Sequence, residues 1–155
     1  MYRINHIYIN RCNVFISLLC LLWFFSGERV TCVWNVFGCG HLLYIFSHAN
    51  LFHLLANICV CLSFKKSINV IAFITAVLIS FFPMSDTPTL GMSALLFAHL
   101  GTTWAPSRLF KTMCKRILPF AILIGLLPSI NLLIHIYALF VGYFLMLLYC
   151  KYFKK

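Results

Sequence analysis

Six stretches of predominantly apolar residues alternate with short polar segments along the chain. They cover residues 12–25, 50–64, 68–83, 91–105, 117–128 and 131–150. Prolines stand near several of their ends, where a helix is expected to stop. The pattern predicts six helices, several of them shorter than the ~20 residues that cross a typical bilayer.

The amino-acid composition indicates a protein that lies in a lipid bilayer. Hydrophobic residues make up 63% of the chain, charged residues only 9%, and the mean hydropathy is +1.00. A soluble globular protein carries more charge on its surface, whereas lipid can cover apolar side chains directly. We therefore expect an all-α membrane protein with six transmembrane helices and the lipid bilayer as a partner.

Basic residues are distributed unevenly among the connecting segments. Of the twelve Lys and Arg residues, all but Arg29 lie before the first stretch, between the second and third, between the fourth and fifth, or after the sixth. Both acidic residues, Glu28 and Asp86, lie in the other set of connecting segments, to which Arg29 also belongs. Because cytoplasmic loops are rich in Lys and Arg, this predicts a multi-pass protein with both termini cytoplasmic, as in a bacterial inner (plasma) membrane. The same clustering explains the net charge of +10 without nucleic acid as a partner.

The N-terminal part also resembles a signal peptide, because a basic segment (residues 1–11) precedes an apolar run. A cleavable signal would end in a small-x-small site, and the exit Ser26-Gly27-Glu28 does not provide one. We expect a retained first helix, one membrane domain over residues 12–150 and a basic cytoplasmic tail over residues 151–155.

Eight cysteines occur, most of them within apolar stretches, where they are expected to act as small hydrophobic residues. A disulfide between Cys32 and Cys39, in the predicted outer loop, is the alternative for that pair. No Cys-x-x-Cys motif is present, which argues against a zinc ribbon or a thioredoxin-type site.

Four polar residues lie near the starts of three predicted helices. His53 and Asn57 are four residues apart and share one helix face, while Ser93 and His135 stand near the starts of the fourth and sixth apolar stretches. In the predicted topology these helices run in one direction, which places all four side chains roughly 3–10 Å below the same surface. Each residue alone is compatible with a packing role, but their common depth predicts a single site.

The residue types restrict the chemistry of this site. Glu28 and Asp86 are the only carboxylate side chains and both fall in predicted loops, which excludes a pair of catalytic acids and a Ser-His-Asp triad. A dyad remains, in which the neutral imidazole of His135 takes the proton of Ser93. The Ser93 backbone N–H and the polar side chains of the second helix are candidate donors to an oxyanion.

These motifs resemble those of the rhomboid family of intramembrane serine proteases. HANLFHLLAN at residues 48–57 resembles the family's His-x4-His-x3-Asn pattern, and GMSA at residues 91–94 resembles its Gly-x-Ser-Gly motif. Residues 135–142 resemble its His-x-x-Gly-x-x-x-Gly pattern. The motif order and the helix assignment also fit, over about residues 41–150.

The resemblance implies a compact six-helix rhomboid-like bundle that cleaves transmembrane segments of membrane protein substrates, without a metal or other cofactor. Ser93 would be the nucleophile and His135 its base, while His53, Asn57 and the Ser93 backbone would form the oxyanion hole. The supporting positions that it implies are His48, Gly91, Phe97, Ala138 and Gly142.

The sequence departs from the family pattern in two motifs. Ala94 and Ala138 replace glycines, and Phe97 stands where the family usually has tyrosine. These departures leave an alternative open, namely a catalytically inactive rhomboid-like protein that binds transmembrane clients. By analogy with the family, the predicted helix over residues 117–128 would be a lateral gate.

A haem or metal protein is a further alternative, with histidines as ligands. The sequence offers no His-Glu-x-x-His motif and few acidic co-ligands. His99 lies about 240° around a helix from Ser93 and so points away from the dyad. The candidate ligands are His41, His48, His53, His99 and His135.

Overall fold

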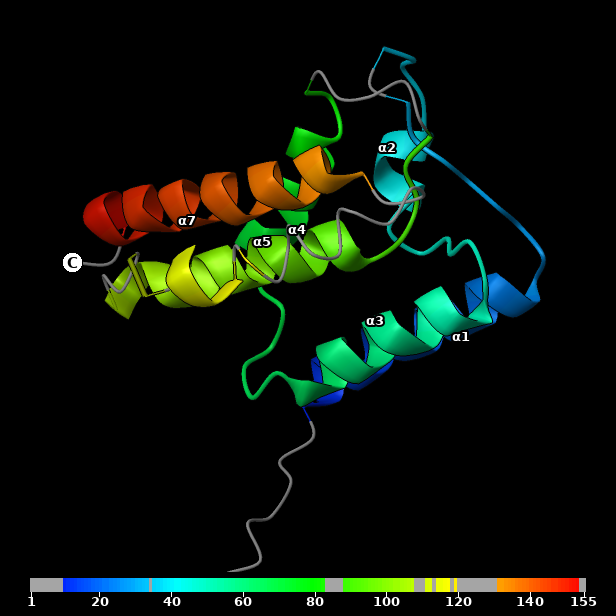
Figure 1. Cartoon of the computed structure of the whole chain (residues 1–155), viewed down its shortest axis with the longest axis horizontal. Coiled ribbons are helices and arrows are strands. Elements are labelled where there is room, and N and C mark those ends of the chain that lie inside the picture. Colours follow the sequence, from blue (N-terminus) through cyan, green and yellow to red (C-terminus); the bar gives the residue numbers. More distant parts are fainter. Residues whose placement is uncertain are drawn as a thin grey trace, which may run out of the picture.

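The computed structural model describes residues 10–33, 35–82, 88–107, 111–112, 114–117, 119 and 131–153, and its regular elements are helices (Figure 1). In chain order they are α1 (Arg11–Phe25), α2 (Gly40–Leu43), α3 (Leu51–Ser63), α4 (Val70–Ile79), α5 (Ser93–Trp104), the 3-10 turn η1 (Ala105–Ser107) and α7 (Leu132–Phe153).

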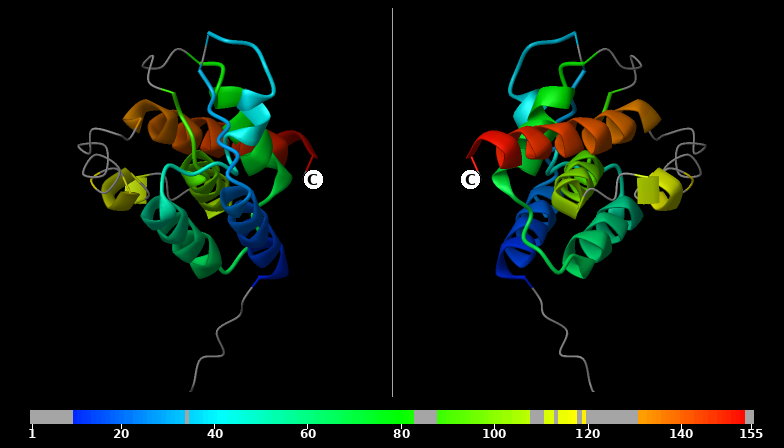
Figure 2. Two further views of the ribbon diagram at one scale, coloured as in Figure 1. Left: turned by 90° about the vertical axis from the view of Figure 1, so that its right-hand side faces the viewer. Right: turned by 90° about the vertical axis from the view of Figure 1, so that its left-hand side faces the viewer.

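The helices form two groups. In the first group, α1 and α3 pack antiparallel to each other. In the second, α4, α5 and α7 pack on one another beside this pair (Figures 1 and 2). α3, α5 and α7 begin at the same end of the molecule (Figure 1). Their first turns are therefore close enough to contribute to one site.

Two glycines bring α5 and α7 into backbone contact. A Cβ atom on Gly101 would overlap the carbonyl oxygen of Leu139, and one on Gly142 would lie 2.7 Å from the carbonyl oxygen of Ala98. Small residues allow two helix backbones to approach this closely. The contact fixes how the two helices are aligned along their length.

Asn13 ties the first helix to the end of the third. This fully buried side chain donates from Nδ2 to the carbonyl oxygens of Cys61, Phe64 and Lys66, at 3.2–3.3 Å, and its Oδ1 accepts from the Ile68 N–H at 3.0 Å. The carbonyls at a helix end lack partners within the helix. The Asn13 side chain supplies these missing partners. It therefore holds the turn between α3 and α4 against α1.

Asparagine side chains also set where helices begin. Asn50 accepts from the His53 N–H at 2.9 Å at the start of α3, and Asn69 accepts from the Ala72 N–H at 2.8 Å at the start of α4. Such caps satisfy one of the free N–H groups of a first turn. The Asn50 cap fixes the first turn of α3, which carries His53.

The expected six-transmembrane bundle is wrong. Helices α1, α3, α4 and α5 have 15, 13, 10 and 12 residues, or about 15–23 Å at 1.5 Å per residue, against a hydrocarbon core of ~30 Å. Within the described part of the chain, only α7, with 22 residues, is long and apolar enough to cross a membrane. Most of the expected fifth helix, at residues 117–128, lies outside the described residues.

The expected multi-pass location in an inner membrane is wrong for the same reason, since one such helix does not make a multi-pass protein. The apolar stretches instead form short helices that partly bury one another. In α5, Ala94, Leu95 and Ala98 are at most 1% exposed, so this apolar stretch faces protein. A stretch of 10–15 apolar residues is equally suited to a buried core helix.

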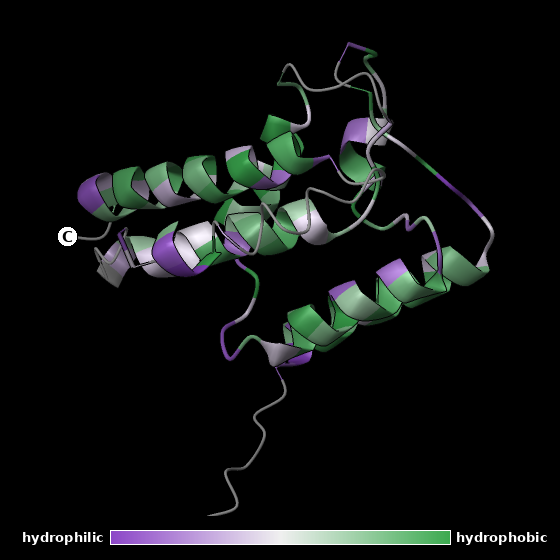
Figure 3. Cartoon of the chain, viewed as in Figure 1, coloured by the Kyte–Doolittle hydropathy of each residue, from purple (hydrophilic) through white to green (hydrophobic). Residues whose placement is uncertain are grey.

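Hydrophobic residues occupy much of each helix (Figure 3), and many of their side chains are exposed. On α1, Phe15 is 62% and Leu22 69% exposed, and on α3 Phe52 is 83% exposed. Exposed apolar area of this extent is typical of surfaces that contact another protein, a membrane or an apolar ligand.

Replacement of Asn13 by leucine tests the contact between α1 and α3. The variant leaves one buried carbonyl, two part-buried carbonyls and one part-buried N–H without their partner, so we expect Asn13→Leu to lower the free energy of unfolding by about 2–4 kcal/mol. Urea unfolding followed by circular dichroism measures it. Asn35→Leu, at an exposed turn, is the matched control and should change this value by less than ~0.5 kcal/mol. Equal effects would show that Asn13 has no special role.

Candidate active site

Ser93 and His135 meet where α5 and α7 begin. Ser93 is the first residue of α5 and is partly exposed, and His135 lies in the first turn of α7 and is 5% exposed. Ser93 Oγ lies 2.7 Å from His135 Nε2, which is within the range for proton transfer between a nucleophile and its base. With Nδ1 carrying the ring proton, the hydroxyl donates to Nε2.

Phe97 packs against the imidazole from one turn further along α5. Its ring centroid lies 4.9 Å from that of His135, with the planes tilted by 45°. A ring at this distance restricts rotation of the imidazole and keeps water from that face. The tyrosine hydroxyl of the family pattern is absent, but the contact between rings is made.

Ala94 and Ala138 are fully packed. Ala94 is 1% and Ala138 0% exposed, while the Ser93 hydroxyl still reaches His135 at hydrogen-bond distance. Close backbone approaches between these helices occur further along, at Gly101 and Gly142. The two extra methyl groups are therefore accommodated without separating the dyad.

His53 and Asn57 of α3 lie against the backbone that leads into Ser93. A Cβ atom on Gly91 would lie 2.6 Å from Cε1 and 3.0 Å from Nε2 of His53, and 3.6 Å from Nδ2 of Asn57. Gly91 has a φ of +115°. Residues other than glycine rarely adopt this backbone conformation. The glycine thus allows both polar side chains to reach the entrance of α5.

Asn57 has an unused hydrogen-bond donor at this place. Its side chain is 6% exposed, and Nδ2 has no partner among the described residues. A buried amide without a partner costs free energy, and a catalytic role is one of the explanations for such a group in a native structure. Here the donor lies beside Gly91, in the segment that leads to Ser93.

His48 supports His53 from the side. It is 1% exposed, its Nδ1–H donates to the Phe46 carbonyl oxygen at 3.1 Å, and its ring centroid is 5.3 Å from that of His53. Burial, and next the proximity of His53, lower the pKa of His48 to about 4, and burial lowers the pKa of His53. Both rings are therefore neutral near pH 7.

Several residues that hold this site together were not found from the sequence. Thr89 forms an isolated antiparallel bridge with Cys32 through two backbone hydrogen bonds of 2.9 Å, and its hydroxyl accepts from Asn131 Nδ2 at 3.0 Å. The Gly91 N–H donates to the Tyr44 carbonyl oxygen at 2.9 Å. Thr89 precedes Ser93 and Asn131 precedes α7, so their bond connects the segments that lead to the two dyad residues. No local motif predicts such a long-range pair.

Two other described histidines, His41 and His99, make their contacts away from the dyad. His41 stacks on Phe81 and His99 packs against Phe64. In the ranges that the structure describes, no three His, Cys, Asp or Glu side chains group as a metal site. Cys32 is buried and Cys39 exposed, and both are free thiols, so the alternative of a disulfide between them is not realised.

Comparisons with known proteins do not identify a family. No protein-family model matches the chain, and no curated protein matches it. The resemblance to rhomboid proteases therefore rests on the motifs and on the arrangement of Ser93, His135, His53 and Asn57.

Replacement of Gly91 by alanine tests this geometry. The methyl group would meet the His53 ring at 2.6 Å in a strained backbone conformation, which costs about 1–3 kcal/mol. We expect Gly91→Ala to lower the free energy of unfolding by that amount, measured by urea unfolding. At Gly38 a Cβ atom meets nothing within 4 Å, so Gly38→Ala should have little effect. Equal stability of both variants would contradict the described contact of Gly91 with α3.

Proposed function

We propose that this chain is a serine endopeptidase that uses a Ser93–His135 dyad, related in mechanism to rhomboid proteases, and that it cleaves apolar transmembrane segments of other proteins. The observation that carries the proposal is the 2.7 Å contact between Ser93 Oγ and His135 Nε2. Serine becomes a useful nucleophile when such a base is in contact with its hydroxyl.

The reaction begins with attack of Ser93 Oγ on the carbonyl carbon of the substrate while His135 Nε2 takes the hydroxyl proton. The tetrahedral intermediate collapses with cleavage of the C–N bond, and His135 passes the proton to the leaving amine. Water then attacks the acyl-enzyme with His135 again as base, which releases the second product and restores the Ser93 hydroxyl. Burial of His135 favours the neutral ring that this cycle requires.

Negative charge on the carbonyl oxygen needs donors that are already in place. The first-turn N–H groups of α5 have no acceptor within the helix, and Ser93 supplies one of them. Asn57 Nδ2 is buried and has no partner in the part of the chain that the structure describes, and His53 lies beside it at Gly91. These groups support the assignment of an oxyanion hole to α3 and the start of α5.

Apolar side chains around the site support an apolar substrate. Leu51 and Phe52, next to His53, are 49% and 83% exposed, and Leu133, two residues before His135, is 42% exposed. An extended apolar peptide would cover these side chains while its carbonyl group reached Ser93. Charged residues are absent from these first turns, so a charged peptide would gain little here.

Replacement of Ser93 by alanine tests the proposed activity. Cleavage of a fluorogenic peptide with an apolar, membrane-spanning sequence should fall to background in Ser93→Ala, because the nucleophile is removed, while the circular dichroism spectrum stays unchanged. Ser63→Ala, which removes a hydroxyl at the exposed end of α3, should keep full activity. Turnover in Ser93→Ala equal to the wild type would refute the assignment. A wild type that binds the peptide without cutting it would favour client binding instead.

The role of Asn57 is tested separately. Removal of one oxyanion donor lowers kcat by about 10²–10³ where it has been measured, so Asn57→Ala should reduce kcat by up to that factor and leave KM nearly unchanged. Asn35→Ala, at an exposed turn, is the control. A change confined to KM would assign Asn57 to substrate binding.

A further inference from the structure

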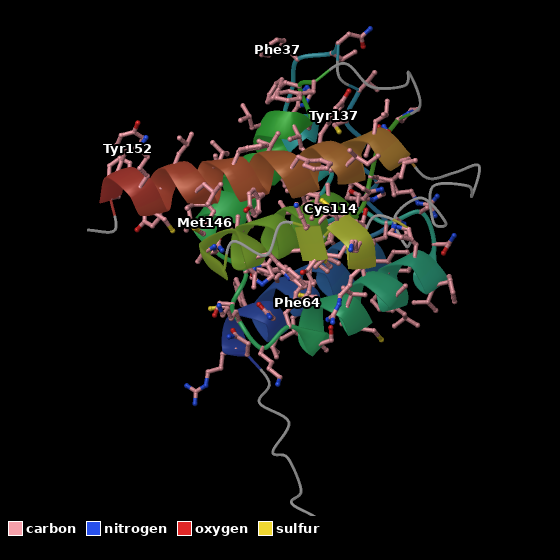
Figure 4. The ribbon with its side chains drawn as sticks, turned by 60° about the vertical axis from the view of Figure 1, so that its left-hand side comes forward. Phe37, Phe64, Cys114, Tyr137, Met146 and Tyr152 are labelled. Carbon is pink, nitrogen blue, oxygen red and sulfur yellow. The ribbon has the colours of Figure 1, made fainter. Side chains whose placement is uncertain are left out.

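A second polar region lies at the other end of α5, away from the dyad. A cavity of about 310 Å³ opens there between the α3–α4 connection, α5 and α7. A neighbouring cavity of about 200 Å³ shares three of its residues, Lys66, His99 and Thr103. Phe64 and Met146 lie on opposite sides of α5 in this part of the molecule (Figure 4).

One wall of the larger cavity is polar and positively charged. Lys66 lines both cavities, and its backbone is held in place because its carbonyl oxygen accepts from Asn13 Nδ2 at 3.2 Å. Asn69 Nδ2 donates to the Thr102 hydroxyl at 3.0 Å, which ties the start of α4 to α5. The polar wall is therefore part of the packed structure.

His99 forms the inner end of this wall. It is 2% exposed, and its Nε2 lies 3.4 Å from the Thr103 hydroxyl. Burial, and next the positive charge of Lys66, lower the pKa of His99 to about 4. The ring is thus neutral at pH 7, and the ammonium group of Lys66 supplies the charge. Thr103, whose hydroxyl lies 3.4 Å from His99 Nε2, lines the same two cavities as Lys66.

The protein offers almost no anion to balance this charge. The sequence has twelve Lys and Arg residues but only two carboxylate side chains, Glu28 and Asp86. Glu28 follows the end of α1 that is far from Lys66, since Asn13 near the start of α1 is the residue that contacts Lys66. Asp86 lies outside the described residues. An anion from outside the protein would complement the Lys66 side of the cavity.

The opposite wall is largely apolar. Pro106, Met146 and Tyr149 line it, and Tyr149 is 45% exposed, so the cavity continues onto the apolar outer surface of α7. A ligand that suits both walls has an anionic head and an apolar tail. Oxygen atoms of a phosphate group match an ammonium and a hydroxyl donor.

We propose that this cavity binds a phosphate-bearing amphiphile, with the phosphate at Lys66 and Thr103 and the apolar chain along Met146 and Tyr149. The site is separate from the dyad, because Ser93 is the first residue of α5 whereas Thr102 and Thr103, which line the cavity, lie in its last turn. An anionic phospholipid and a free phosphate share the head-group chemistry, and the apolar wall favours the phospholipid.

Calorimetric titration of the full chain in a nonionic detergent tests the proposal with three probes: dioctanoyl phosphatidate, dioctanoyl phosphatidylcholine and inorganic phosphate. We expect phosphatidate to bind, and Lys66→Gln to weaken its binding by about tenfold or more, as expected for loss of a charge-assisted hydrogen bond. Arg29→Gln removes one positive charge at the far end of the molecule and should leave the Kd within about twofold.

The variant Tyr149→Ala distinguishes binding of a phospholipid from binding of free phosphate. It should weaken binding of phosphatidate, whose chains contact this wall, and leave binding of inorganic phosphate unchanged. Phosphatidate binding that is insensitive to Lys66→Gln would overturn the proposal. Equal binding of phosphatidylcholine, or inorganic phosphate binding as tightly as phosphatidate with no effect of Tyr149→Ala, would overturn it as well.

Discussion

The backbone contact between α5 and α7 determines the geometry of the dyad. Gly101 fits against the Leu139 carbonyl and Gly142 against Ala98, and close-packed interiors leave little room for either helix to slide. Because the helices start at the same end (Figure 1), this alignment brings the first residue of α5 against the first turn of α7. The 2.7 Å contact of Ser93 with His135 follows from packing one to two turns away.

The remaining polar groups reach this point through separate connections. Gly91 lets His53 and Asn57 approach the chain before Ser93, and Thr89 bonds to both Cys32 and Asn131. Asn13 holds α1 against the turn that follows α3. Each connection places a buried donor against an acceptor, and such pairs are favoured because an unpaired buried group is costly. Asn57 Nδ2 is one of four buried side-chain atoms, with those of Ser17, His48 and His99, that have no hydrogen-bond partner among the described residues.

The positions of the helices could be predicted from the apolar pattern. The stretch at residues 91–105 contains α5 (Ser93–Trp104), and the stretch at residues 50–64 contains α3 (Leu51–Ser63). Their membrane topology could not be predicted, because 10–15 apolar residues suit a buried helix as well as a short span. Ser93 and His135 could be singled out because each lies near a helix start, which is a local feature. The structure shows the contact between their side chains, and their catalytic roles stay a prediction.

Other parts of the site depend on contacts between residues far apart in the chain. The bond between Thr89 and Asn131 and the cavity that Lys66, His99 and Tyr149 line combine residues from different helices and loops. Neither has a spacing or composition that the sequence displays. For His99, helical periodicity indicated only that its side chain points away from Ser93, and the structure adds what it points toward.

Covalent labelling of the serine tests the central claim most directly, because it requires the hydroxyl and the imidazole to act together. The wild-type chain is treated with a fluorophosphonate probe, and the modified residue is located by peptide mass spectrometry. The dyad predicts a single adduct on Ser93, which His135→Ala abolishes and His99→Ala leaves in place. An adduct on another serine, or labelling of Ser93 that does not depend on His135, would contradict it.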